Sequence, residues 1–595
     1  MPSTSKITNS NLSKDIFFNR NGRFICVKLL KNPILHISRC FIRMLPFKKQ
    51  IENYKLVDYL LLLVIVVGIF LRLFHYFSNR SLWLDEGYLV SSLLRLNYHE
   101  LLNTSLDYQQ KAPVGFLLVV KFFLTLLGNN QYSLRIVPLL SGILSILVFV
   151  PVAKYFLKEW GLFTAATIIC LSPAFIYHSV EIKQYSTELL CSVLSFYLIL
   201  KFKNFRHKKD YIILSLGGAV MLWFSYSAIF ILGGIGIGLS VHYSLTRQWG
   251  LLFKSFIPFS IWLISFIFLF VLFINKIPDA DWVVKWFRFY DNFLPLPPKS
   301  LSDLNWIFIN FYRMLDYPLG LLWNFAGSAE HGHLYNIVIK MPFLPMIIIF
   351  VGIYFCYKHS RENFALLIAP LLLVFLASGL EYYPLTERFW LFISPVFLVF
   401  IGISVDGINI KKGSTTVKSA IVVLLLISPI IQAFDSVKNQ ETFYVHKKSF
   451  QKELFQLIDT DFRKGDAVYI YWNELSGYNV LRKLSNYKFH AIQGKDFRSE
   501  SKNLTEYNSN LSKDFERFKR HKRVWVVFNN KYLSNVGDPI NSPSWYYDNK
   551  NVPSGNLRAQ LTKIGTILKT VKTYDVTFYL VRIGNDALNV PSPAR

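Results

Sequence analysis

The chain has 595 residues, of which 52% are hydrophobic and 17% aromatic, while only 17% are charged. Several apolar runs approach or exceed the roughly 20 residues that a helix needs to cross a bilayer, so the composition excludes an ordinary soluble protein. The formal net charge is +28, but the basic residues cluster between the apolar runs and form no separate basic domain. We therefore expect contact with membrane lipids and no nucleic-acid partner.

Residues 1–56 form a polar, basic segment that lacks the short charged, apolar and cleavage regions of a signal peptide. We expect this segment to be cytoplasmic and the first span to be retained as a signal anchor. The five cysteines lie in this segment and in apolar runs, and none lies in the polar C-terminal region. The sequence therefore predicts neither a disulfide framework nor a cysteine metal site.

Apolar runs predict about eleven transmembrane helices. Their expected ranges are 57–77, 136–153, 161–178, 187–200, 211–224, 228–243, 255–274, 342–357, 363–380, 389–405 and 418–434. The run 113–128 is left out because it is short and carries Lys121 at its centre, where a charge costs about 2.5–3.5 kcal/mol on insertion scales. We expect it to be an amphipathic helix in the outer membrane interface.

The positive-inside rule supports this topology. If 113–128 does not span, the basic loop "KFKNFRHKKD" at 201–210 lies in the cytoplasm; if it does span, that loop lies outside. The favoured topology gives a transmembrane domain at 57–434 with long outer loops at 78–135 and 275–341. It also places residues 435–595 outside the membrane on the extracytoplasmic side.

The C-terminal region, 435–595, changes character and reads as a soluble α/β domain. Three segments, "DAVYIYW", "RVWVVFN" and "VTFYLVRI", have the pattern of strands, whereas "KDFERFKRH" and "LRAQLTKIGTILK" have the pattern of helices. The fold class predicted for the whole chain is a polytopic α-helical membrane protein with a C-terminal α/β domain.

Charged residues from distant parts of the sequence gather at the predicted outer ends of the helices. They occur in "SLWLDEGY", "YQQKAPVGF", "SLRIVP", "EIKQYS" and "LTERFWLFISP", and comprise Asp85, Glu86, Lys111, Arg135, Glu181, Lys183 and Arg388, with Tyr185 beside them. Ionisable groups at this depth are costly, so they are candidates for function. Lys and Arg suit a lipid phosphate, and a carboxylate can activate an acceptor or hold a divalent cation.

Four of these segments, "LWLDEGY", "QKAPVGF", "EIKQYS" and "ERFWLFISP", resemble the spaced signatures of the GT-C membrane glycosyltransferases. The branch they resemble most contains the protein O-mannosyltransferases and the lipid A aminoarabinose transferases. The resemblance runs from about residue 57 to 410. It implies an inverting transferase that moves a hexosyl or pentosyl group from a polyprenyl-phosphate donor to a lipid, glycan or protein acceptor.

The resemblance also implies roles for individual residues. Asp85, with Glu86 beside it, matches the acidic position of the first outer loop, which serves as base or positions the acceptor or a metal. Lys111 matches a Lys or His that faces the lipid phosphate, although "KAP" here replaces a Pro-Pro and changes the backbone restraint. Arg388 matches a late Arg near the phosphate. The remaining candidates are Lys183, Tyr185 and Arg135 for the phosphate and Glu181 for substrate or metal support; whether a divalent metal is used stays open.

Each residue also has a purely structural interpretation. Glu86 could cap a helix, Lys111 could extend its amine to the interface, and Arg135 or Arg388 could anchor helix ends at lipid headgroups. Tyr185 could belong to an aromatic belt, and Glu181 could pair with a neighbouring helix. We expect a packing or hydrogen-bonding role for His178, and "EHGHLY", with His331 and His333, is a poor zinc motif without further ligands.

The favoured function is an integral-membrane glycosyltransferase with its site on the extracytoplasmic face, in a bacterial inner membrane. One alternative is a flippase or transporter of lipid-linked saccharides, but transporters place key charges near the bilayer midplane and often contain repeated halves. Another is a non-catalytic membrane scaffold for the C-terminal domain.

Overall fold

A computed structural model describes residues 55–274, 281–326, 332–408, 414–440, 449–531, 543–548 and 553–584. The predicted cytoplasmic segment lies outside these ranges except for its last two residues, as do His331 and the side chain of His333.

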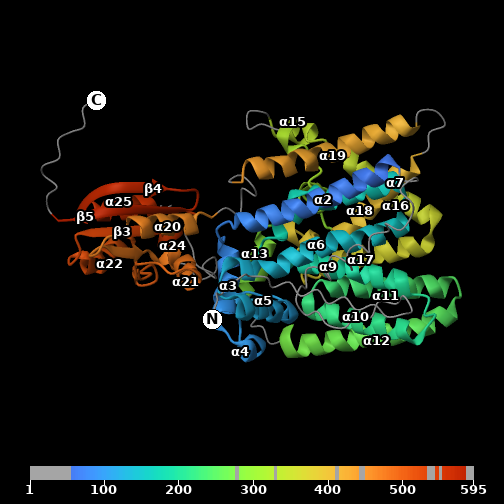
Figure 1. Cartoon of the computed structure of the whole chain (residues 1–595), viewed down its shortest axis with the longest axis horizontal. Helices are drawn as coiled ribbons and strands as arrows, with labels where there is room; N and C mark the ends of the chain where they lie inside the picture. The colour runs from blue at the N-terminus through green and yellow to red at the C-terminus, as the bar shows by residue number, and fades with distance from the viewer. Residues whose placement is uncertain are drawn as a thin grey trace, which may run out of the picture. The chain divides into compact units, whose positions relative to one another are not determined.

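Long helices that run roughly parallel dominate the part of the chain before residue 440 (Figure 1). In chain order the elements are α2 (Leu56–Ser78), α3 (Leu84–Arg95), α4 (Tyr98–Asn103), η2 (Asp107–Gln109), α5 (Val114–Leu127), α6 (Gln131–Phe156), α7 (Glu159–Leu171), α8 (Pro173–His178), α9 (Tyr185–Phe202), α10 (Lys208–Phe224), α11 (Ala228–Leu245), α12 (Trp249–Leu269), η3 (Phe270–Ile274), α13 (Asp281–Phe289), α14 (Leu301–Asp316), η4 (Asn324–Ala326), α15 (His333–Ile339), α16 (Phe343–His359), α17 (Arg361–Gly379), η5 (Glu387–Trp390), α18 (Ser394–Gly407) and α19 (Ser414–Lys438).

Seven of the described helices are long and apolar enough to cross a membrane, and four shorter ones are also apolar. The seven occupy Leu56–Ser78, Gln131–Phe156, Tyr185–Phe202, Ala228–Leu245, Trp249–Ile274, Arg361–Gly379 and Thr416–Lys438. Helical structure is present at each of the eleven predicted ranges. A membrane-embedded, mainly helical fold is thus confirmed, while the number of spans stays a prediction.

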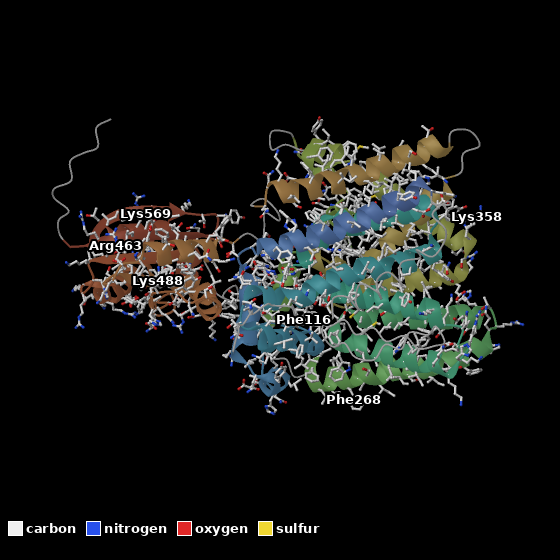
Figure 2. The ribbon with its side chains drawn as sticks, in the orientation of Figure 1. Phe116, Phe268, Lys358, Arg463, Lys488 and Lys569 are labelled. Atoms are coloured by element: carbon white, nitrogen blue, oxygen red, sulfur yellow. The ribbon has the colours of Figure 1, made fainter. Side chains whose placement is uncertain are left out.

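Side chains distinguish the flank of the bundle from its ends. In Figure 2, Phe268 of α12 lies on the flank, where 56% of its surface is exposed, whereas Phe116 of α5 lies inside the structure. Lys358, in the last turn of α16, lies at the end of the bundle away from α3 and α5. We refer to the opposite end, where α3 and α5 lie, as the α3 end.

The predicted interfacial helix corresponds to α5, which begins at Val114 and ends at Leu127. Its Lys121 does not sit unpaired among apolar groups: the ammonium donates a hydrogen bond of 2.9 Å to the carbonyl of Leu93, in the last turn of α3. The ammonium lies near the C-terminal end of α3, where a positive charge interacts favourably with the negative end of the helix dipole. Lys121 therefore ties α5 to α3.

The predicted outer loop 275–341 reaches into the helical bundle after α14. The Ser172 hydroxyl donates to the carbonyl of Pro318 at 2.6 Å, Gln432 donates to Gly320 at 3.1 Å, and Ser428 donates to Leu322 at 2.6 Å. Gly320 has φ +65°, a conformation that favours glycine. Side-chain donors from α19 and from the α7–α8 junction thus satisfy irregular backbone, as membrane proteins require.

The C-terminal region contains helices and a five-stranded sheet, while its predicted bounds as a domain stay a prediction. Its described elements are α20 (Gln451–Asp461), β1 (Ala467–Ile470), η7 (Trp472–Glu474), α21 (Leu475–Leu484), β2 (Ala491–Gln493), α22 (Leu504–Phe515), η8 (Glu516–Phe518), β3 (Arg523–Asn529), α24 (Ser544–Asp548), α25 (Pro553–Leu561), β4 (Gly565–Lys572) and β5 (Val576–Ile583). The strand order is β2-β1-β3-β5-β4; β1 is parallel to β2 and β3, and β5 is antiparallel to β3 and β4.

The three strands predicted in this domain are confirmed as β1, β3 and β5, but the helix predicted for "LRAQLTKIGTILK" is wrong in its second half. The helix α25 ends at Leu561, and β4 begins at Gly565. A Cβ atom at Gly565 would lie only 2.1 Å from the carbonyl oxygen of Arg582, so glycine permits the close strand pairing there. The short strand β2 carried no signal that the sequence analysis recognised.

Helix α21 of the α/β domain packs directly against α3. Val480 and Leu484 join the apolar cluster formed by Leu89, Val90 and Leu93 of α3. Close by, Lys452 donates to the carbonyl of Asn79 at 2.8 Å. The helix that carries Asp85 and Glu86 is thus supported by α5 and by the C-terminal domain.

Candidate active site at the α3 end

Helix α3 begins immediately after Trp83 and carries Asp85 and Glu86 in its first turn. Carboxylates at a helix N-terminus interact favourably with the positive end of the helix dipole. Successive helical residues point about 100° apart, so the two side chains enter different surroundings. Asp85 faces Lys183 and Arg388, whereas Glu86 is fully buried against other groups.

Asp85 bridges two cations that come from distant parts of the sequence. One carboxylate oxygen accepts a hydrogen bond of 3.0 Å from the Lys183 ammonium, and the other accepts one of 2.8 Å from Arg388. The exposed fractions of the side chains are 18% for Asp85, 5% for Lys183 and 22% for Arg388. The structure therefore brings the three predicted residues together and leaves two of them partly open to solvent.

These charges fix the protonation states of the cluster. Burial alone would raise the pKa of the Asp85 carboxyl, but Lys183 and Arg388 outweigh burial and hold that pKa below its usual range. Burial opposes the charge on Arg388, but its neighbours Tyr185 and Asp85 raise the pKa of the guanidinium overall. Asp85 is thus an ionised carboxylate in contact with two cations.

Aromatic rings surround the Arg388 guanidinium. Its central carbon lies 5.9 Å from the ring centre of Trp83, 5.3 Å from that of Tyr185 and 5.6 Å from that of Phe389. Such rings stabilise a cation through their quadrupole. They also restrict the orientation of the guanidinium, and Tyr185, a predicted site residue, contributes its ring to this arrangement.

Lys111 lies beside the cluster but contacts none of its members. The intervening Gln110 accepts a short hydrogen bond from Lys183. Two consecutive left-handed residues, Tyr108 and Gln109, precede it, an uncommon backbone that turns the chain toward Lys183. The Lys111 side chain is exposed and, within the described ranges, has no ion pair or hydrogen bond.

Lys111 lines a cavity of about 130 Å³ whose other walls are mainly apolar. The lining side chains include Val114 and Leu117 of α5, Tyr226, and Leu272 and Phe273 at the end of the Trp249–Ile274 span. Tyr226 donates to the carbonyl of Ala112 at 3.1 Å and so fixes the backbone next to Lys111. An unpaired cation at the edge of an apolar cavity suits an amphiphile with an anionic head.

Glu86 and Arg135 form a separate, deeper network. Glu86 contacts Arg80 at 2.8 Å and Arg135 at 3.6 Å, and it accepts hydrogen bonds from the backbone of Ile182 at 2.9 Å and of Trp83 at 3.2 Å. The structure thus places both residues away from the Asp85 cluster. Their contacts hold the start of α3 against the loop that carries Lys183.

Glu181 lies in a third set of contacts. One of its oxygens accepts from the Trp83 indole at 3.0 Å, and the other bonds to the His178 ring at 2.5 Å. The second ring nitrogen of His178 makes a short hydrogen bond to the Tyr317 hydroxyl. Sequence reasoning missed Tyr317, because nothing local marks a contact across 139 residues.

The carboxylates at the α3 end do not form an evident cation site. Both oxygens of Asp85 and both oxygens of Glu181 already face donors, and within the described ranges no three His, Cys, Asp or Glu side chains are grouped suitably for a metal ion. As arranged, these residues do not fit a resident divalent metal.

Comparison with known proteins finds similarity to a family model over part of the chain and to solved structures. Comparison with curated protein sequences finds no match. The fold resembles the crystal structure of ArnT from Cupriavidus metallidurans bound to undecaprenyl phosphate, with a TM-score of 0.48, 13% identity, and coverage of 87% of this chain and 97% of that one. It also resembles an Archaeoglobus fulgidus oligosaccharyltransferase tethered to an acceptor peptide, with a TM-score of 0.47, 11% identity, and coverage of 88% and 74%. Residues 110–274, which include Lys111, Glu181, Lys183 and Tyr185, match the family model described as dolichyl-phosphate-mannose-protein mannosyltransferase.

Proposed function

We propose that the protein is an integral-membrane glycosyltransferase that moves a sugar from a polyprenyl-phosphate donor to an acceptor at the α3 end of the bundle. The observation that carries this proposal is Asp85 held between Lys183 and Arg388, next to the unpaired Lys111 and its apolar-walled cavity. The family match over 110–274 supports the same class of reaction.

The donor fits the site by its two chemical parts. Its phosphate would bind Lys111, Lys183 and Arg388, of which Arg388 offers two parallel donors. The first isoprene units would lie against the apolar walls formed by Leu117 and Phe273. A lipid whose head is anionic and whose tail is apolar thus matches both the charges and the cavity.

In the proposed reaction, an acceptor hydroxyl or amine attacks the anomeric carbon of the sugar from the face opposite the phosphate. The bond between that carbon and the phosphate oxygen breaks, and the configuration inverts. The acceptor proton passes to the Asp85 carboxylate, while polyprenyl phosphate leaves with the electron pair. The cations stabilise the charge that develops on the leaving oxygen.

Phosphate binding would also activate Asp85. Lys183 and Arg388 lower the pKa of Asp85, which makes it a weak base. A donor phosphate shares these two cations and reduces their effect on Asp85. The carboxylate therefore becomes a better proton acceptor only when the donor is present.

We further propose that the α3 end faces the extracytoplasmic side of a bacterial inner membrane, with the N-terminus in the cytoplasm. The basic loop at 201–210 and Lys358, which lies at the opposite end of the bundle, support this orientation. The C-terminal domain, whose α21 supports α3, would then be extracytoplasmic.

The test compares wild type with Asp85→Asn in proteoliposomes that contain radiolabelled undecaprenyl-phosphate mannose and a cell-envelope acceptor fraction. We expect transfer to fall about 10²–10⁴-fold, the usual contribution of a general base, while binding of undecaprenyl phosphate persists. Glu387→Gln, an exposed carboxyl next to Arg388, is the matched control and should keep full activity. Undiminished transfer by folded Asp85→Asn would refute the assignment, and lipid translocation without any glycosylated product would favour a flippase.

A further inference from the structure

The segment from α13 to α14 exposes an unusual row of large apolar side chains. The exposed fractions are 79% for Phe289, 84% for Leu301, 51% for Leu304 and 46% for Ile307, and Trp286 is exposed to 41%. Single exposed apolar residues are common, but several large ones on two consecutive helices indicate a surface that contacts a partner or a membrane. We call this series the apolar ridge.

The opposite face of α14 is packed, so the exposed side chains are not a sign of a loose segment. Trp306 is buried and donates to the carbonyl of Asp291 at 2.6 Å, and Asn310 donates to the carbonyl of Trp306 at 3.2 Å. Met314 and Leu315, in the last turn of α14, are also completely buried, so the protein encloses the end of the helix. Helix α14 is therefore fixed in orientation, with one face on the protein and the apolar ridge facing outward.

The segment that carries the apolar ridge packs against the flank of the bundle. Phe311 of α14 stacks on Phe350 of α16 with ring centres 5.6 Å apart, and Phe350 is itself 57% exposed. Leu296, in the loop between α13 and α14, covers Gly379 at the end of α17, where a Cβ atom would lie 2.7 Å from the leucine. Helix α17 is one of the candidate spans, so the ridge extends a lipid-facing surface.

Charged residues border the ridge rather than interrupt it. Lys285 and Lys299 are exposed, and Arg288 pairs with Glu381 at 2.5 Å. Long basic side chains can bury their stems among apolar groups while the charge reaches water at headgroup level. The pattern of an apolar face with basic residues at its border is typical of helices that lie in a membrane interface.

We propose that α13 and α14 insert the apolar ridge among the acyl chains of the bilayer leaflet at the α3 end. The segment would enter one leaflet without crossing the membrane. Neither α13 nor α14 meets the length and hydropathy of a span, and the chain beyond α14 turns back at Gly320 inside the protein. This interface goes beyond the proposed transferase activity and does not depend on it.

The inserted segment contacts the candidate active site. Phe287 of α13 packs edge-on against Phe389, with ring centres 5.6 Å apart, and Phe389 lies directly beside Arg388. The Phe389 ring also contacts Tyr185, with ring centres 6.1 Å apart. Lipid contact along the ridge would therefore hold the wall of the site in place.

The experiment places one nitroxide spin label at a time on the full-length protein in phosphatidylcholine vesicles, at Phe289→Cys, Leu301→Cys or Leu304→Cys. Relaxation by oxygen, which concentrates in lipid, is compared with relaxation by a water-soluble nickel chelate. Leu372→Cys, 61% exposed on α17, is the lipid-facing control, and Lys464→Cys, exposed on the C-terminal domain, is the aqueous control. Background labelling of the native cysteines is measured on protein without an introduced cysteine.

We expect all three ridge positions to resemble Leu372→Cys, with strong oxygen and weak nickel relaxation. Strong nickel relaxation, as at Lys464→Cys, would show that the ridge faces water and would overturn the proposal. Weak relaxation by both reagents would mean that protein covers the ridge, which would overturn it equally. Because the measurement needs no substrate, its outcome is independent of the proposed transfer reaction.

Discussion

The first turn of α3 carries two neighbouring carboxylates whose surroundings differ sharply. Asp85 is partly exposed and contacts two cations that are themselves near a cavity, whereas Glu86 is fully buried and contacts two arginines and two backbone amides. A partly exposed carboxylate can exchange its partners for a substrate, whereas a carboxylate that is completely buried keeps its partners and serves as a fixed structural link. The difference supports the proposed catalytic role for Asp85 and indicates a structural role for Glu86.

The largest effect should come from Glu86→Gln. The amide keeps the shape but removes the charge, leaving Arg80 and Arg135 without their buried counter-ion, so we expect a loss of about 3–5 kcal/mol in stability. The measurement is thermal unfolding of the detergent-solubilised protein, followed by size-exclusion chromatography. Asp85→Asn should unfold near the wild-type temperature. Equal destabilisation by both substitutions would show that the two acids contribute equally to stability and would contradict this difference in their roles.

A smaller effect is expected from Lys111→Ala. This lysine has no partner within the described ranges, so its loss should leave stability unchanged but weaken binding of undecaprenyl phosphate by about 10- to 100-fold, since a hydrogen bond to a charged group contributes roughly 1.5–3 kcal/mol. Binding is measured by native mass spectrometry, with Lys111→Arg as the charge-preserving control. Equal affinity of Lys111→Ala and wild type would show that Lys111 does not bind the phosphate.

The smallest effect concerns pH. Because Arg388 lowers the pKa of Asp85, Arg388→Gln should raise that pKa, and Asp85 would then become protonated at a higher pH. The acidic limb of the pH profile of kcat/KM should therefore move to higher pH in the variant, so that the variant loses activity at a pH where the wild type is still active. An unmoved acidic limb would show that a group other than Asp85 controls it.

Sequence reasoning predicted the convergence of Asp85, Lys183 and Arg388 because charged residues at several helix ends on one membrane face tend to face the protein interior and pair with one another. It treated Glu86 as a partner of Asp85, since a linear sequence does not show that adjacent helical positions diverge by about 100°. Arg135 was also assigned to the phosphate site, and only its contact with Glu86 shows that it lies in a different environment.

Other features carried no local signal at all. The hydrogen bonds from Ser172 and Gln432 to Pro318 and Gly320 turn part of a predicted outer loop into an interior element, yet the loop itself has ordinary turn residues. In the C-terminal domain, β4 has a helix-like pattern, and only its pairing with β5 makes it a strand. Tertiary contacts decided both cases.

The packing of α21 on α3 has a consequence for how the chain attains activity. Val480 and Leu484 complete the apolar surface behind the helix that presents Asp85, so a chain that ends before residue 449 would leave that surface bare. Because α21 comes long after α3 in the chain, this surface can be completed only after the C-terminal region has been synthesised. The α3 end, including Asp85, would therefore assemble only when this later part of the chain is present.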